Sequence, residues 1–140
     1  MASLAPDAAP SVEKTIVAWL TELGRTATKR DSGDELPFRI VKRVAGADNP
    51  IVGIDTASVS IHTLAATSTA AHDEAQLTHR RMTLLARNPD TAITLLGGGV
   101  VNVDYCTTLM SPIEVDYGET GIKRYVARYE IGVSYLPVAP

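Results

Sequence analysis

The sequence predicts a single α+β domain, in which two helices pack on one face of a four-stranded antiparallel sheet in the order α-β-β-α-β-β. Three observations predict this fold class. Apolar residues recur at helical spacing in two segments, and they alternate with polar residues in four others. The chain has 140 residues, of which 45% are hydrophobic and 21% are charged, as in one globular domain of ordinary density. No linker long enough to divide the chain interrupts the pattern.

The first helix is expected to begin at Ser11, a residue type that caps helices, and Glu13 in its first turn suits the helix dipole. The polar segment 31–35 contains a glycine and ends the helix. Residues 1–10 include two prolines and are expected to form a flexible lead into the domain, which spans residues 11–136. The apolar stripe of this helix is formed by Val12, Ile16, Leu20, Leu23 and Ala27.

Two strands are expected next. The segment 36–44 is rich in β-forming residues and has a proline near its start, where a missing N–H does least harm. Turn-forming residues at 46–50 separate it from a second strand over 51–64. This second strand alternates between apolar and polar residues, so one face is expected to be buried and the other wet or in an interface. Its inward positions are Ala57, Val59 and Ile61.

The second helix is expected over residues 68–88. One of the residues 67–69 caps it, and the Asn-Pro pair at 88–89 ends it. Its buried stripe begins with alanines, so the helix is expected to approach the sheet closely there. The stripe consists of Ala71, Ala75, Thr78, Met82 and Leu85.

A long C-terminal hairpin is expected from strands over 100–113 and 124–136, with a turn at 117–121. A turn centred near Glu119 makes odd positions of one strand meet odd positions of the other, so that the two apolar faces coincide. This register pairs Leu109 with Tyr129. It also pairs Tyr105 with Val133. The expected core of the sheet is a set of tyrosines, namely Tyr105, Tyr125, Tyr129 and Tyr135, while residues 137–140 form a tail.

The same hairpin carries the candidate contact surfaces. Pro112 is expected to bend it, so that residues 111–125 form a protruding arm, and an apolar arm without cover usually contacts a partner. The expected arm contacts are Ile113, Val115, Tyr117, Glu119 and Ile122, with Tyr117 as a contact either to another subunit or to a different partner protein. The polar face of the hairpin is expected to be a subunit interface of complementary charges, because an open sheet leaves exposed edges. Its residues are Asn102, Asp104, Arg124, Arg128 and Glu130.

The composition excludes several function classes. Thirteen Lys and Arg against 16 Asp and Glu give a net charge of −3, whereas proteins held to nucleic acid by phosphate contacts carry a basic excess. The single cysteine, Cys106, excludes a disulfide-stapled domain and is expected to lie half-buried in a strand. No apolar run reaches the roughly 20 residues that cross a bilayer, and the N-terminus lacks signal-peptide features. We therefore expect a soluble protein made in a reducing cytoplasm.

No pattern indicates catalysis, a cofactor or a metal site. His72 and His79 lie seven residues apart on one helix, about 10 Å along its axis, which is too far to share a metal ion. His62 lies on a separate strand. The glycines at 97–99 precede a strand rather than a helix, so they are expected to form a flexible link and not a phosphate loop. The chain is therefore expected not to be an enzyme.

Four stretches carry a resemblance to a known family. They are PFRIVKRVAG at 37–46, IDTASVSIHTLAAT at 54–67, the Ala- and Arg-rich helix at 68–88 and RYVARYEIGV at 124–133. Through them the chain resembles the tail terminator (tail-completion) proteins of long, non-contractile-tailed bacteriophages, especially those that infect actinobacteria. The likeness covers residues 11–136, and the family has no catalytic signature.

The resemblance implies a non-enzymatic structural protein of the virion. Proteins of this family form a hexameric ring on the head-proximal end of the tail tube, stop tube polymerisation and dock the neck of the filled head. The implied partners are further copies of the chain, the tail tube protein and the head–neck connector or stopper protein. DNA passes through such a ring without specific binding, and the net charge of −3 gives no strong electrostatic hold on it. No membrane is involved.

Two alternatives remain open. One is another neck component, such as a connector or stopper, or the tail tube subunit, although a tube subunit would show more β-structure and less helix than the sequence predicts. The other, from a different class, is a small α+β enzyme or ligand-binding module that uses the polar sheet face. The mass of the purified protein at low and high concentration separates the assembling proteins from a monomeric module.

Overall fold

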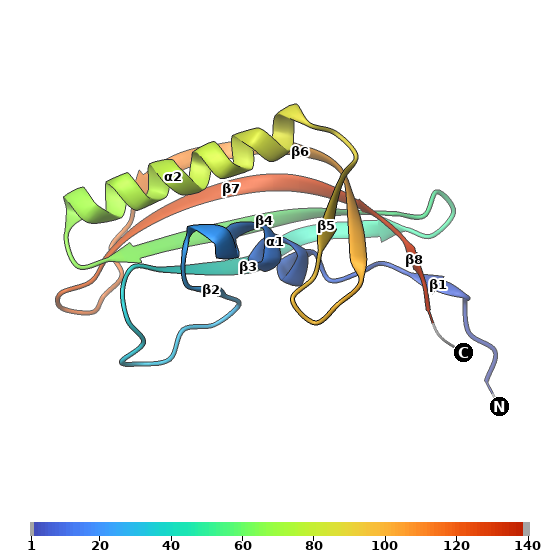
Figure 1. Ribbon diagram of the computed structural model, residues 1–140, viewed down its shortest axis with the longest axis horizontal. Coiled ribbons are helices and arrows are strands. Elements are labelled where there is room, and N and C mark those ends of the chain that lie inside the picture. The colour runs from blue at the N-terminus through green and yellow to red at the C-terminus, as the bar shows by residue number, and fades with distance from the viewer. Residues whose placement is uncertain (1, 139–140) are drawn as a thin grey trace.

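The structure is a computed structural model and describes residues 2–138. A curled six-stranded sheet carries both helices on one face (Figure 1). The strand order is β2-β3-β4-β7-β6-β5. Four strands are long: β3 (Phe38–Asn49), β4 (Ile54–Ala65), β6 (Val100–Glu114) and β7 (Lys123–Ser134). The edge strands β2 (Thr26–Ala27) and β5 (Thr91–Thr94) are short.

The two ends of the chain form a second, small sheet. β1 (Asp7–Ala8) pairs with β8 (Leu136–Pro137) in antiparallel fashion, and this pair extends away from the main sheet (Figure 1). Part of the expected flexible lead and part of the expected C-terminal tail are therefore strands. Residues 139–140 of that tail lie outside the described residues.

The predicted four-stranded antiparallel sheet is wrong. β2 pairs in parallel with β3, with Thr26 opposite Arg39, and β5 pairs with β6 as a fifth antiparallel strand. The first helix was expected to continue through Thr26 and Ala27, so β2 was not predicted. Instead α1 (Val12–Leu20) passes into a 3-10 turn, η1 (Thr21–Leu23), and Gly24 ends it with a φ of 145° that other residues rarely adopt. The chain then turns to the edge of the sheet.

The turn between β3 and β4 also lies later than predicted. β3 runs through the expected turn to Asn49, whose side-chain oxygen accepts a hydrogen bond from the backbone N–H of Ile51 at 3.0 Å. Gly46 lies within the ladder, just after a register shift at Val44, and has a φ of 111°. A Cβ on Gly46 would lie 2.2 Å from the carbonyl oxygen of Thr56. The glycine is therefore needed for close approach of two strands and not for a turn.

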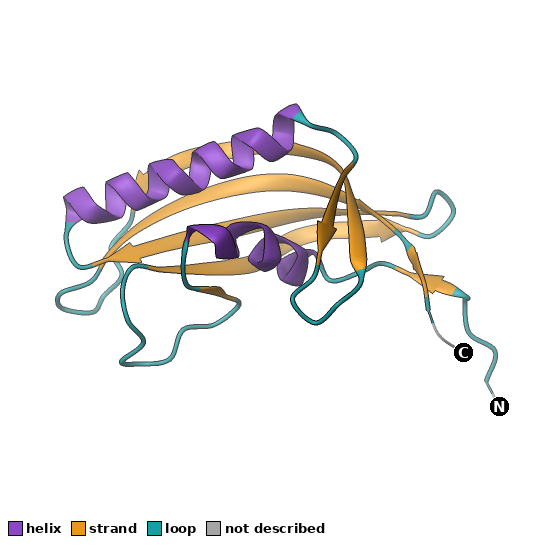
Figure 2. Cartoon of the chain, in the orientation of Figure 1, coloured by secondary structure: helices purple, strands orange, loops and turns teal. Residues whose placement is uncertain are grey.

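The second helix is confirmed. α2 (Ser68–Arg87) is capped by Thr67, whose hydroxyl accepts a hydrogen bond from the N–H of Ala70 at 3.1 Å, and Asn88 follows its last residue. Its length covers β4, β6 and β7 (Figure 2). The buried side chains are those predicted, namely Ala71, Ala75, Thr78, Met82 and Leu85.

The predicted register of the last hairpin is wrong, because β6 contains three register shifts against β7. Thr108, not Leu109, lies opposite Tyr129, and Tyr105 lies opposite Gly132. The shift next to Asp104 reverses the inward side of β6, so Cys106 is 6% exposed in the core and Tyr105 lies on the opposite face. Of the four expected core tyrosines, only Tyr129 is fully buried.

The core lies between the helices and the sheet, and a smaller apolar cluster closes one end. This second cluster contains Phe38, Leu64 and Ile122, with Tyr117 packed against it. The loop between β6 and β7 thus packs against the end of the sheet. Two of the five expected arm contacts, Tyr117 and Ile122, are therefore covered by the chain's own residues. Among residues 2–138 no helix is long and apolar enough to cross a membrane.

Candidate functional site

The helices leave one face of the large sheet open, here called the helix-free face. Side chains alternate across a strand, and Val101, Val103, Ala127, Tyr129 and Ile131 point into the core. Their neighbours therefore point outward. All five residues predicted to form a subunit interface lie on the helix-free face, namely Asn102, Asp104, Arg124, Arg128 and Glu130.

At one end of this face the predicted residues bond to each other. The Asp104 carboxylate accepts hydrogen bonds from the Ser134 hydroxyl at 2.8 and 2.9 Å, and from the side-chain amide of Asn102 at 2.5 Å. These contacts join β6 to β7 next to the register shift. Asn102 and Asp104 thus have internal partners and hold the sheet together at this point.

At the other end Arg124 holds the β6–β7 loop. Its guanidinium donates to the backbone oxygens of Asp116 at 2.6 Å and Val115 at 3.4 Å, and it lies 5.5 Å from the centre of the Tyr117 ring. One guanidinium nitrogen also lies 3.4 Å from Nδ1 of His62. Arg124 therefore positions the loop, and its guanidinium is already hydrogen-bonded within the chain.

Arg128 lies between these two ends and has a different environment. Its side chain is exposed, and within the described residues no hydrogen bond or ion pair reaches it. Glu130, two residues further along β7, is half-buried and likewise has no such contact among residues 2–138. These are the two predicted interface residues whose charged groups are available for a partner.

A groove of about 390 Å³ runs across the helix-free face beside Arg128. Apolar side chains of Val44, Met110 and Ile113 line it, together with Arg124. Val44 is 49% exposed and Ile113 is 50% exposed. The groove is therefore apolar and basic, and open to solvent.

His62 lies in this groove, in surroundings that favour the neutral imidazole. Burial lowers its pKa, and the positive charges of Arg124, Arg128 and Lys42 lower it further. Since arginine only donates, Nδ1 of His62 accepts from Arg124, and Nε2 carries the proton toward the Ser60 hydroxyl at 3.0 Å.

The Ser60–His62 pair is poorly suited to nucleophilic catalysis. A general-base histidine becomes positively charged and is normally oriented by a carboxylate, whereas His62 has Arg124 in that position. Ser60 is also only 2% exposed, so its hydroxyl is covered. The arrangement opposes the charge that the reaction would develop, so it does not favour the enzyme alternative.

The cysteine and the other two histidines are buried or packed against other side chains of the chain. Burial raises the pKa of the Cys106 thiol to about 12. His79 bonds the Tyr129 hydroxyl through Nδ1 at 2.7 Å, and the ring of His72 packs edge-on against Tyr125. The described part of the chain brings together no group of three or more metal-ligating side chains. The glycines at 97–99 form the tight turn between β5 and β6, closed by a bond from Leu95 N–H to the Gly99 oxygen at 2.9 Å.

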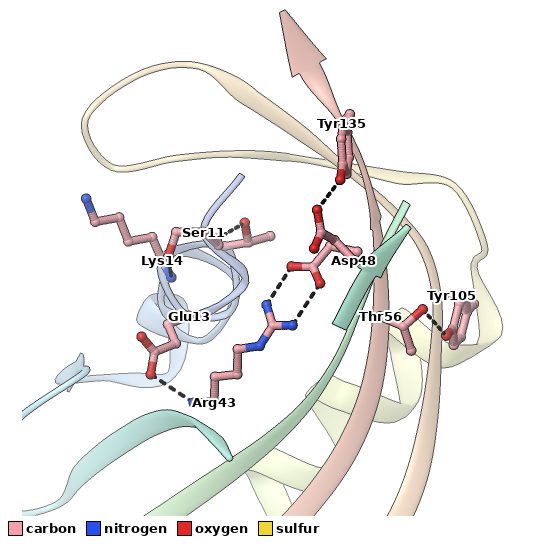
Figure 3. A network of polar contacts seen from close by, with 10 residues as sticks. Ser11, Glu13, Lys14, Arg43, Asp48, Thr56, Tyr105 and Tyr135 are labelled. Carbon is pink, nitrogen blue, oxygen red and sulfur yellow. Dashed lines mark hydrogen bonds and ion pairs between the residues drawn. The ribbon is translucent and has the colours of Figure 1, made fainter. Parts of the chain in front are cut away.

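A polar network near the start of α1 was not foreseen from the sequence (Figure 3). Arg43 forms a two-pronged ion pair with Asp55 at 2.5 and 2.8 Å, and its backbone N–H donates to Glu13 at 2.8 Å. The Asp55 hydrogen bond is the main cause of a raised pKa of Arg43. Asp48 accepts a hydrogen bond from the Tyr135 hydroxyl, which raises the tyrosine's pKa to about 12. The Glu13–Arg43–Asp55 contacts tie α1 to β3 and β4, and the Asp48–Tyr135 bond ties β3 to the residue that follows β7.

The outer side of α2 also carries a feature that the sequence analysis missed. Leu77, Arg80, Leu84 and Arg87 follow one another at spacings of three, four and three residues, so they form one line along the helix. We call this line the α2 stripe. Leu77 is 40% exposed and Leu84 is 48% exposed. The spacing is present in the sequence, but an exposed helix face with alternating leucine and arginine does not by itself indicate a contact site.

Comparisons with known proteins do not assign a family. No family model matches the chain, and no curated protein matches it. A proposal for the function therefore rests on the helix-free face and on the sequence stretches that resemble tail terminator proteins.

Proposed function

We propose that the chain is a structural virion protein that forms a ring on the head-proximal end of a phage tail tube. The ring ends tube polymerisation and docks the head–neck connector. The observation that carries the proposal is the helix-free face, where Arg128 has no partner among the described residues and lies beside the exposed Val44 and Ile113. Exposed apolar patches rimmed by polar groups are typical of protein–protein contact sites. The resemblance supplies the kind of assembly.

In this proposal the helix-free face is buried when copies assemble. The apolar groove gives contact area, and Arg128 and Glu130 give charges that a neighbouring surface satisfies. Virion localisation and the partners, namely the tail tube protein and the connector or stopper protein, follow from the resemblance. DNA passes through the opening of the ring, and a net charge of −3 suits a lumen that does not retain it.

Arg128→Glu tests the interface without disturbing the loop that Arg124 holds. Reversing this charge is expected to weaken assembly on the order of tenfold or more, because like or unmatched charges oppose association. The matched control is Lys14→Glu, which reverses an exposed cation of α1 that no ion pair reaches within residues 2–138. Analytical ultracentrifugation gives the assembly, and circular dichroism checks the fold. Equal assembly of Arg128→Glu and wild type would remove this face from the interface.

The tail tube subunit is a second candidate, and one observation favours it. A tube subunit is expected to have more β-structure and less helix than the sequence predicts, and the structure has a six-stranded sheet plus a two-stranded one in place of four strands. α2, with its 20 residues, agrees better with the terminator. Electron microscopy of the assembled protein distinguishes the two, because a terminator forms closed rings and a tube subunit forms open-ended tubes.

A further inference from the structure

The α2 stripe has the properties of a docking surface. A groove of about 540 Å³ lies beside it, with Leu23 and Arg81 in its wall. Arg81 is fixed, since its guanidinium stacks 3.6 Å from the centre of the Trp19 ring and pairs with Glu22 at 3.2 Å. In contrast, no ion pair reaches Arg80 or Arg87 within residues 2–138. The stripe thus offers two exposed leucines and two unpaired cations in one line.

A segment at the other end of the molecule is complementary to this stripe. Residues 113–119 read IEVDYGE, so apolar and acidic side chains alternate at the end of β6 and in the loop that follows. We call these residues the acidic segment. Glu114 accepts from the Ser68 hydroxyl at 2.7 Å, and Asp116 accepts from the Gly118 N–H at 3.1 Å. No ion pair reaches either carboxylate within the described part of the chain. Glu119 forms a long ion pair with Arg30 at 3.9 Å, and half of its side chain stays exposed.

The other acidic loop of the chain is neutralised locally. Glu35 pairs with Arg25 at 2.5 Å, and Asp31 pairs with Lys29 at 3.5 Å. The acidic segment is therefore the better match for the unpaired arginines of the α2 stripe.

These two surfaces cannot meet within one copy. The Ser68–Glu114 hydrogen bond fixes the acidic segment at the first turn of α2. Arg80 and Arg87 lie 12 and 19 residues further along the helix, which is about 18 and 28 Å at 1.5 Å per residue. Any contact between them joins two copies.

We propose that the α2 stripe of one copy binds the acidic segment of the next copy, head to tail. The inference rests on the proposed self-assembly and names the contact that joins neighbours. Direct pairing of two α2 stripes is disfavoured, because the arginines would face each other. A contact between two different surfaces repeats from copy to copy, and it closes into a ring when the rotation between copies allows it.

Two charge-reversed proteins test the contact. The stripe variant carries Arg80→Glu and Arg87→Glu, and the segment variant carries Asp116→Arg and Glu119→Arg. Each alone is expected to assemble on the order of tenfold more weakly than wild type, because its two surfaces repel. An equimolar mixture is expected to recover assembly, because each surface then meets its opposite charge in alternating copies. Lys14→Glu is the matched control, and sedimentation velocity is the measurement.

The outcomes separate this contact from the proposed function. If wild type is monomeric at every concentration, both proposals are wrong. If wild type and the stripe variant assemble equally, or if the mixture of folded variants does not recover, only the head-to-tail contact is wrong. Circular dichroism checks that each variant folds. Should the segment variant unfold, Leu77→Ser with Leu84→Ser tests the same contact from the helix side, and unchanged assembly of that protein overturns it.

Discussion

The surroundings of His62 favour its neutral form, and this makes the stability of the folded protein depend on pH. Its pKa in the folded protein lies below the ordinary value of 6.5, mainly because of burial and then because of Arg124. The unfolded chain therefore binds a proton that the folded chain resists, and stability falls as the pH drops through about 6.5.

We expect His62→Gln to reduce this dependence, since glutamine keeps polar contacts but does not titrate. The free energy of unfolding by urea, measured near pH 7 and near pH 5, is expected to differ less in the variant than in wild type. An identical difference in the two proteins would show that His62 is not the group responsible.

Cys106 gives a second prediction at the scale of one residue. Because burial raises its pKa to about 12, the thiol is protonated at neutral pH and is covered by the core. A thiol reagent at pH 8 is expected to leave the native protein unlabelled and to label it fully after unfolding. Rapid labelling of the native protein, followed by mass spectrometry, would contradict the buried position.

Gly46 gives a third prediction at the scale of one residue. A Cβ at this position would meet the Thr56 carbonyl at 2.2 Å, and the backbone φ of 111° is strained for other residues. Gly46→Ala is expected to lower the free energy of unfolding by about 2–4 kcal/mol. Gly97→Ala is the matched control, because nothing lies within 4 Å of its Cβ position. Similar stability of the two variants would mean that the strands approach less closely at Gly46.

At the scale of elements, one buried arginine fixes α2 on the sheet. Arg39 of β3 is 0% exposed, donates to Thr78 at 2.7 Å and pairs with Glu74 at 2.7 Å. Both partners lie on α2. A charged residue in an apolar strand pattern has no sequence signal that names its partner, so this anchor was not predicted.

Removing the counter-charge is expected to weaken that anchor. Glu74→Gln leaves the Arg39 charge buried and is expected to cost about 1–3 kcal/mol of stability, less than a fully buried pair because 26% of the Glu74 side chain is exposed. Glu22→Gln removes a carboxylate that is 76% exposed from the Arg81 pair, and is expected to cost less than about 1 kcal/mol. Equal melting temperatures for the two variants would refute the anchor.

The elements also show what the sequence could predict and why the rest was hidden. Helical spacing and a cap define α2 locally, so its residues were predicted. The register of β6 depends on shifts beside Asp104, near Leu109 and between Met110 and Ile113, which leave no mark in an alternating pattern. β2 and β5 are two and four residues long, too short to show a period, and exist because long neighbours offer them hydrogen bonds.

At the scale of the whole molecule, the curled sheet brings its two edges toward one another. One groove of about 570 Å³ is lined by Thr26 of β2, by Leu96 after β5 and by Val17 of α1, although β2 and β5 are opposite edges. α1 packs between them. Both helices thus pack against the inner side of the sheet. The helix-free face and the α2 stripe remain as surfaces for assembly.

The sequence could predict on which face the candidate interface residues lie, but not which side chains they contact. Alternation correctly placed Asn102, Asp104, Arg124, Arg128 and Glu130 on the outer face. It carried no information on which of these charges the chain satisfies itself. The structure separates Arg128, which has no partner among residues 2–138, from Arg124, which holds a loop.

The size and shape of the assembled protein test the central claim most directly. Purified protein at high concentration, imaged by electron microscopy and weighed by native mass spectrometry, is predicted to form closed rings of six copies with a central opening. The rings are also predicted to bind the end of isolated tail tubes. A monomer at every concentration, with no binding to tubes, would contradict the proposed function.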